Sequence, residues 1–194
     1  MRIIGITGGV GAGKSRVLDF LQEHYGASVY KADEVAKNLQ KKGTACYDDI
    51  VAEFGREILD PEEELDRNKL AEIIFSDPQK LQRLNQIVHP AVREYLLSHI
   101  EEERKKQTQY MIIEAALLLE EGYDEICNEI WYIYASEEVR KERLMRSRGY
   151  GEEKVAQIMA SQLSEDVFRS RCSASVENNR DFEDTMRQIG ELLE

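Results

Sequence analysis

The segment GITGGVGAGKSR, residues 5–16, carries glycines, a lysine and a serine at a spacing that suits phosphate binding. Gly8 through Ser15 fit the pattern GxxxxGK[ST] in full. Glycines let successive backbone N–H groups turn inward around phosphate oxygens without clashes from Cβ atoms. Lys14 is expected to reach the β- and γ-phosphates of a nucleotide, and the Ser15 hydroxyl is expected to hold Mg²⁺. The predicted ATP-binding residues of this loop are Gly11, Ala12, Gly13, Lys14, Ser15 and Arg16.

The loop also lies where this motif must lie, between a buried strand and the start of a helix. Residues 2–7 are mostly apolar and predict a buried strand. Residues 17–25 repeat apolar side chains at helical spacing, and Gly26 is a typical helix C-cap. The helix N-terminus adds a positive dipole beside the expected phosphates. The alternative interpretation is a glycine-rich turn in which Ser15 only caps the helix.

Two acids follow predicted strands, at the edge where ligands bind in parallel α/β sheets. Asp33 closes the strand predicted for residues 28–33, which we expect beside the strand of the phosphate loop. Its carboxylate could accept the proton of a substrate hydroxyl and orient that hydroxyl toward the γ-phosphate. The alternative role of Asp33 is to cap the next helix. Glu114 ends the strand predicted for residues 110–114, and it either orders the water shell of Mg²⁺ or faces solvent.

Arginines are concentrated in residues 140–148, RKERLMRSR, although the chain as a whole is acidic. Arg140 and Arg143 are one helical turn apart, and Arg146 or Arg148 continues toward the expected helix end. Such a helix could close over ATP as a lid and stabilise charge on the phosphoryl group in transfer, which would make Arg143 and Arg148 catalytic. The alternative is a solvated basic face that balances acidic helices around it. Residues 149–151, Gly-Tyr-Gly, would then be the hinge of the lid.

The elements that must position these residues alternate between strands and helices. The β–α–β order of the first 33 residues implies a parallel sheet with right-handed crossovers. Residues 34–108 are charged, favour helices and contain all three prolines, which predicts several short helices begun or ended by these prolines. The predicted later elements are strands at 110–114, 129–135 and 173–177, a helix capped by Ser136, and helices at 152–172 and 182–193.

The chain has 38 acidic and 26 basic side chains, which give a net charge of −12. We expect no nucleic-acid partner, although a small anion could bind in a locally basic cleft. Three widely spaced cysteines without a CxxC pair indicate reduced thiols rather than zinc ligands or disulfides. The longest apolar run, residues 115–119, is too short to span a membrane, and the first residues do not have the pattern of a signal peptide. We therefore expect a cytoplasmic protein with no membrane partner.

The phosphate loop leaves open whether the nucleotide serves phosphoryl transfer, switching or movement. Switch GTPases need a base-reading NKxD motif, and the nearest match, residues 178–181, has Asn179 in place of the lysine. Motor ATPases usually have larger chains and partner surfaces. An inserted helical segment and an arginine-rich helix within 194 residues are typical of small-molecule P-loop kinases.

Several short motifs, in this order, resemble the dephospho-CoA kinases, which phosphorylate the ribose 3′-hydroxyl of dephospho-CoA to give coenzyme A. The likeness covers almost the whole chain. The TGGxGxGKS loop is moderately specific, and Arg67, Phe75 and His89-Pro90 at these distances from it are more specific. The matching stretches are residues 7–15, 32–33, 65–75, 84–85 with 89–90, 117–120, Arg143 and the segment after it, Gln162, and residues 177–178.

The resemblance implies a P-loop NTPase fold, which is a three-layer α/β/α architecture with a five-stranded parallel sheet. It implies that Asp33 is the general base and that Asn178 lies near the adenine. Arg67, His89 and Glu120 are expected to face the acceptor. The implied single domain has a core of residues 1–33, 109–139 and 173–194, a helical acceptor-binding insertion at 34–108, and a lid at 140–172.

Several positions depart from the family pattern. Lys31 replaces the first acid of a usual Asp-x-Asp, which leaves Asp33 as the only base candidate there. Arg16 and Ala116 stand where threonine and proline are common. Phe168 and Ser173 replace frequent lysine and aspartate residues, so the contacts of that segment with phosphate or adenine stay open.

The predicted activity is phosphorylation of the 3′-hydroxyl of dephospho-CoA by ATP and Mg²⁺, the last step of coenzyme A biosynthesis. ATP and dephospho-CoA are the expected small-molecule partners, and the protein is expected to be a monomer or a small homo-oligomer. A nucleoside monophosphate kinase would share the loop, the lid and the size, and would differ in its acceptor. A nucleotide-binding regulator without phosphoryl transfer is the alternative from another class.

Overall fold

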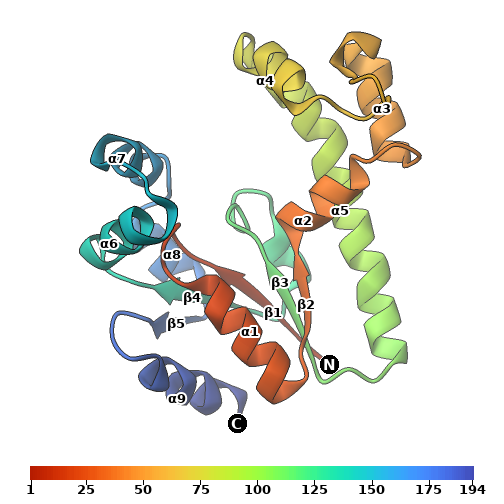
Figure 1. The fold of residues 1–194 in the computed structure, drawn as a ribbon. Helices are drawn as coiled ribbons and strands as arrows, with labels where there is room; N and C mark the ends of the chain where they lie inside the picture. The colour runs from red at the N-terminus through yellow and green to blue at the C-terminus, as the bar shows by residue number, and fades with distance from the viewer. The chain divides into compact units, whose positions relative to one another are not determined.

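A computed structural model describes all residues, 1–194, and they form two compact units (Figure 1). The first unit comprises Met1–Tyr30 and Glu103–Glu194, and the second comprises Lys31–Glu102. No helix is both long enough and apolar enough to cross a membrane. The strands are β1 (Arg2–Thr7), β2 (Ser28–Lys31), β3 (Tyr110–Glu114), β4 (Glu129–Tyr134) and β5 (Ala174–Glu177).

These strands form one five-stranded parallel sheet in the order β2-β3-β1-β4-β5. On β1, Ile4 is level with Ile112 of β3, and Ile6 is level with Trp131 of β4. The prediction that β2 lies beside β1 is wrong, because β3 lies between them. A parallel arrangement brings the carboxyl ends of β1, β3 and β4 to one edge of the sheet, which is where the phosphate loop begins.

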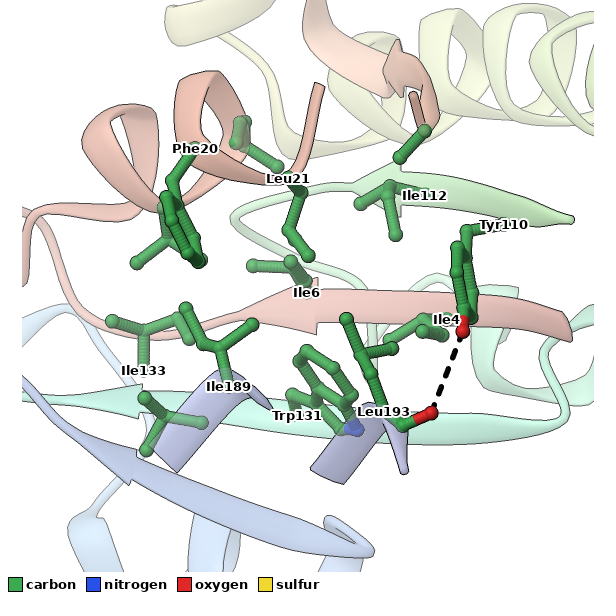
Figure 2. Close-up of a cluster of buried hydrophobic side chains, with 14 of the residues drawn as sticks. Ile4, Ile6, Phe20, Leu21, Tyr110, Ile112, Trp131, Ile133, Ile189 and Leu193 are labelled. Atoms are coloured by element: carbon green, nitrogen blue, oxygen red, sulfur yellow. Dashed lines mark hydrogen bonds between the residues drawn. The ribbon is translucent and has the colours of Figure 1, made fainter. Parts of the chain in front are cut away.

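One face of the sheet is covered by α1 (Lys14–Tyr25) and α9 (Phe182–Leu193), both at the predicted positions. Figure 2 shows Phe20 and Leu21 of α1 facing Ile6 of β1, with Trp131 and Ile189 beside them. Each such buried side chain contributes about 1.5–3 kcal/mol by leaving water. The sheet and its two helices therefore form the rigid base on which the loop is built.

The other face of β4 is covered by α8 (Glu165–Arg171), whose Phe168 ring stacks on Tyr132 with centroids 4.7 Å apart. The predicted helix at 152–172 is two helices, α7 (Glu152–Ala160) and α8, because Ser164 caps a new helix through the Val167 N–H. Before them, α6 (Glu137–Arg148) begins at the predicted cap Ser136.

The second unit is helical, with α2 (Ala32–Leu39), α3 (Ala45–Phe54), the 3₁₀ turn η1 (Arg56–Ile58), α4 (Arg67–Phe75) and most of α5 (Pro78–Lys105). Pro78 begins α5 as predicted, but Pro90 lies inside this helix, so the predicted break there is wrong. The cause is a stripe of buried residues four apart, Val88, Val92, Leu96 and Ile100. Their combined burial exceeds the cost of about 3 kcal/mol for an internal proline.

A buried carboxylate anchors the C-terminal end of α5 in the first unit. Glu103 is 3% exposed and accepts hydrogen bonds from the Ser28 hydroxyl at 2.7 Å and the Tyr30 hydroxyl at 3.0 Å, both on β2. Lys106 donates to the same carboxylate at 2.8 Å, and Thr108 donates as well. Hydrogen bonds from Lys106 and Thr108, with those from β2, lower the pKa of Glu103 to about 2.

Candidate phosphate-transfer site

The loop between β1 and α1 takes a backbone path that only glycine allows at its two ends. Gly8 has φ 145°, and a Cβ there would collide with the carbonyl oxygen of Ile133 on β4. Gly13 has φ 90°, and a Cβ there would collide with the side-chain amide of Asn178. The glycines of the motif therefore serve close packing against the protein as well as access of phosphate oxygens to backbone N–H groups.

Lys14 is the first residue of α1, and its ammonium group lies at the loop. Its Nζ donates to the carbonyl oxygen of Gly8 at 2.8 Å and lies 3.6 Å from a carboxylate oxygen of Glu114. Glu114 ends β3, the strand next to β1, so the predicted acid at this strand end does lie beside the loop. A cation and a carboxylate therefore meet where the phosphates of a nucleotide are expected.

Ser15 and Arg16 follow Lys14 in the first turn of α1 and are exposed. The Ser15 hydroxyl makes no hydrogen bond within the protein, so it is open to a ligand from solvent. The Arg16 guanidinium lies over the ring of Phe182 on α9, 4.0 Å from its centroid. That stacking holds the Arg16 side chain against α9. The Arg16 backbone N–H donates to the carbonyl oxygen of Gly13 at 3.2 Å.

Asn178 follows β5, and all four of its polar groups are hydrogen-bonded inside the protein. The Nδ2 group donates to the carbonyl oxygen of Ala12 at 2.7 Å, and Oδ1 accepts from the Thr185 hydroxyl at 3.1 Å. Its backbone N–H donates to Tyr134 at 2.7 Å, and its carbonyl accepts from Arg143 at 2.8 Å. The carboxamide of Asn178 therefore joins the phosphate loop to α9. The position of Asn178 near the adenine, which the family resemblance implies, stays a prediction.

Arg143 of α6 bridges the same two segments from the other side. One guanidinium nitrogen donates to the Ala12 carbonyl at 3.3 Å, and the other donates to the Asn178 carbonyl. Partial burial lowers the pKa of Arg143, and the positive charge of Arg146 lowers it further, although arginine remains charged in proteins. A cation that has lost part of its hydration interacts strongly with an anion nearby, as phosphoryl transfer requires.

A second arginine of α6, Arg140, contacts the phosphate loop at Val10, two residues before the Ala12 carbonyl that Arg143 contacts. Arg140 donates from Nε to the carbonyl oxygen of Val10 at 3.0 Å and also donates to the side chain of Gln162. The same Gln162 oxygen accepts the Val10 N–H at 3.3 Å. Spacing alone gave Arg140 no defined partner, because Gln162 follows it by 22 residues. The signal available was the presence of Gln162 among the motifs of the family resemblance.

The remaining predicted residues are distributed over both units. Arg148 ends α6 and lies 5.9 Å from the centroid of the Tyr150 ring, and Glu120 is exposed in the turn after β3. In the second unit, Arg67 is the first residue of α4 and His89 lies in α5. Asp33 does not end β2, which stops at Lys31, and it lies instead in the first turn of α2. Its carboxylate is exposed and has no protein partner.

Comparison with known proteins agrees with this geometry. A family model described as dephospho-CoA kinase matches residues 2–184. The chain belongs to the dephospho-CoA kinase family. Members of this family are kinases that phosphorylate dephospho-CoA in the final step of coenzyme A biosynthesis, with ATP as the other substrate.

Individual dephospho-CoA kinases match over nearly the whole chain. The protein of that name from Dehalococcoides mccartyi is 37% identical, with 95% of this chain and 92% of the relative covered. The crystal structure of TT1252 from Thermus thermophilus is 31% identical, with a TM-score of 0.82 and coverage of 99% and 96%. A dephospho-CoA kinase from Campylobacter jejuni, 20% identical, has the same fold, with a TM-score of 0.73 and coverage of 99% and 98%. The predicted P-loop fold and family are thereby confirmed.

Proposed function

We propose that this chain transfers the γ-phosphoryl group of ATP to the ribose 3′-hydroxyl of dephospho-CoA, giving coenzyme A and ADP. The observation that carries the proposal is a complete phosphate loop in a chain whose whole length matches this family. The loop residues Gly11 to Arg16 are proposed to bind the phosphates through backbone N–H groups at the start of α1. The N–H groups of Ala12 and Arg16 would exchange or share their contacts with Gly9 and Gly13. Lys14 would exchange its contact with Gly8 for the β- and γ-phosphates.

Asp33 is the proposed general base. Its carboxylate is exposed and unpaired in the first turn of α2, so it is available to accept the proton of the attacking hydroxyl. Arg143 and Arg148 are proposed to stabilise the charge on the phosphoryl group as it moves. Arg143 supports this role through its partly dehydrated guanidinium beside the loop, where a bound γ-phosphate would add to its existing carbonyl contacts.

Mg²⁺ is the proposed metal cofactor, and the side chains at the loop fit it. The Ser15 hydroxyl and the Glu114 carboxylate are hard oxygen donors, and Mg²⁺ typically combines one or two such groups with phosphate oxygens and water. Ser15 is proposed to bind the ion directly, and Glu114 is proposed to order its water. When bound, the ion would neutralise charge on the β- and γ-phosphates.

The acceptor is proposed to contact Arg67, His89 and Glu120, and Asn178 is proposed to lie near the adenine of ATP. We also propose the division into a core, an acceptor-binding insertion at 34–108 and a lid at 140–172. The protein is proposed to act in the cytoplasm as a monomer or small homo-oligomer, without nucleic-acid or membrane partners. These assignments extend the family match to named residues.

The deciding experiment measures ADP release from ATP and Mg²⁺ with dephospho-CoA, AMP, UMP and CMP offered in parallel, and weighs each product. We expect turnover with dephospho-CoA alone and a product one phosphate heavier. Turnover with a nucleoside monophosphate instead would mean that the acceptor is wrong while the phosphate site is right. Retention of the γ-phosphate in single-turnover conditions with every acceptor would favour a nucleotide-binding regulator.

A further inference from the structure

A pocket of about 270 Å³ lies wholly within the second unit, between α2 and the start of α4. Its lining includes three cationic side chains, Lys37, Lys41 and Arg67, together with the aliphatic Leu70 and a single acid, Glu64. Only Arg67 among the three cations was singled out from the sequence. A pocket with this lining is unusual in a chain whose net charge is −12.

The three cations have no protein partner, which separates them from neighbouring basic residues. Lys42, next to Lys41, pairs with Glu63 at 2.6 Å, and Lys69 near Arg67 donates to the Leu59 carbonyl at 2.6 Å. By contrast, Lys37, Lys41 and Arg67 make no side-chain hydrogen bond or ion pair. The Glu64 carboxylate accepts the backbone N–H of Lys42 at 3.1 Å instead of pairing with a cation in the pocket. The pocket therefore has positive charge available for an anion.

The pocket is one helical turn from the proposed general base. Asp33 and Lys37 are four residues apart on α2, so they lie on the same side of the helix and about 6 Å apart along its axis. Lys41 follows after a further four residues, just beyond the end of α2. A ligand whose hydroxyl group lies at Asp33 could thus place a second, anionic group beside Lys37 and Lys41, which are one and two helical turns further along.

We propose that this pocket binds the 5′-diphosphate of the acceptor, an inference that rests on the proposed function. Dephospho-CoA carries its reacting 3′-hydroxyl and its diphosphate on the same ribose, so the two groups are held a few bonds apart. The Arg67 guanidinium can bind a phosphate with two parallel hydrogen bonds, and the two lysines add point charges. Lys37 and Lys41 are about one helical turn apart, and two linked phosphates can reach both, whereas a single phosphate cannot. The pocket therefore selects diphosphate esters over nucleoside monophosphates.

The test compares dephospho-CoA with adenosine, which has the 3′-hydroxyl and lacks the diphosphate. In the variants Lys37→Met, Lys41→Met and Arg67→Met, we expect KM for dephospho-CoA to rise roughly 10–100-fold, as for a lost charge-assisted hydrogen bond. The ratio of kcat/KM for dephospho-CoA to that for adenosine should fall by the same factor. Lys80→Met is the matched control, because Lys80 is an exposed lysine of the same unit without a side-chain partner.

Three outcomes would overturn the inference. They are an unchanged KM for dephospho-CoA in the variants, an equal fall in kcat/KM with dephospho-CoA and with adenosine, or an equally large rise in KM in Lys80→Met. Thermal melting of each variant identifies any that fails to fold, and Arg67→Lys then replaces Arg67→Met with the charge kept and the paired hydrogen bonds lost. If the wild-type chain makes no product from dephospho-CoA, the proposed function fails. Titration calorimetry of dephospho-CoA against wild type and Lys37→Met still decides the pocket, since weaker binding supports it and equal binding refutes it.

Discussion

The side-chain amide of Asn178 donates a 2.7 Å hydrogen bond to the carbonyl oxygen of Ala12, joining residues 166 positions apart. The bond lies in the buried interior, where an unsatisfied donor or acceptor is costly. Arg143 donates to the same Ala12 carbonyl and to the Asn178 carbonyl, so α6, the phosphate loop and the segment after β5 meet at one point. The protein's own hydrogen bonds therefore hold the loop at this point.

Replacing Asn178 with aspartate should weaken the use of ATP through this contact. The Asn178→Asp change puts a carboxylate oxygen against the Ala12 carbonyl, and two acceptors repel. We expect KM for ATP to rise at least about tenfold at pH 8. An acid facing a carbonyl in a buried site has a raised pKa, so lowering the pH should protonate it and restore a donor. Steady-state kinetics from pH 8 to 5.5 would then show the variant recovering relative to wild type.

Asn128→Asp is the control for that change. Asn128 accepts the Ile3 N–H at 2.7 Å near the start of β1, far along the strand from the loop, and aspartate keeps that acceptor. Its kinetics should follow wild type at every pH. A pH-independent loss in Asn178→Asp, or the same loss in Asn128→Asp, would show that Asn178 contributes only to general stability.

Asp33→Asn should lower turnover by roughly two to four decades, the range expected for loss of a general base. The folded state should be unaffected, because the carboxylate is exposed and makes no protein contact. Rapid-quench measurement of the chemical step and a thermal melt check the two halves of this prediction. Near wild-type turnover, with chemistry shown to limit the rate, would remove Asp33 from this role.

Lys14→Ala should damage catalysis far more than folding. The side chain makes a hydrogen bond to Gly8 and contacts Glu114, whereas in catalysis it is proposed to stabilise charge on the phosphates. We expect kcat/KM to fall about 10²–10³-fold or more, with a small change in melting temperature. Enzyme kinetics and calorimetry on the same preparation provide the comparison. A collapse of the melt that matches the loss of activity would make Lys14 structural.

Stability should fall in acid as Glu103 becomes protonated. Its folded-state pKa of about 2 lies below the unfolded value of about 4.3, so its contribution is complete above the unfolded pKa and is lost as the pH falls toward 2. Glu103→Gln should therefore be less stable than wild type at pH 7, by roughly 2–3 kcal/mol. Urea unfolding between pH 7 and 2 should show this difference shrinking below about pH 4–5. A difference independent of pH would mean that packing, rather than charge, is responsible.

The sequence predicted well what depends on neighbours along the chain. The phosphate loop, the cap Ser136 and the helix at 182–193 were all placed correctly because each depends on residues within one or two turns. Helix termini and hydrophobic periodicity are local properties, and the printed residues contain them.

The errors lay where the tertiary structure overrides the local sequence pattern. Pro90 favours a helix end locally, but buried residues every fourth position keep α5 continuous. In the sheet, β3 lies beside β1 and separates it from β2, and no local sequence pattern specifies this order. Asp33 lies in α2 rather than at the end of β2, because the helix already begins at Ala32. The contacts of Asn178 join positions far apart in the chain, so only the folded structure could assign them.

The Tyr30 hydroxyl lies 3.0 Å from the Glu103 carboxylate, and these two residues bound the segment that forms the second unit. The chain therefore leaves the first unit and returns to it at adjacent points. The entropy of closing a loop between adjacent points grows only slowly with its length. The segment Lys31–Glu102 can therefore be lengthened, shortened or replaced as one unit, while the strands that carry the phosphate loop keep their register. Under the proposed role of this segment in acceptor binding, acceptor range and phosphate chemistry could change independently.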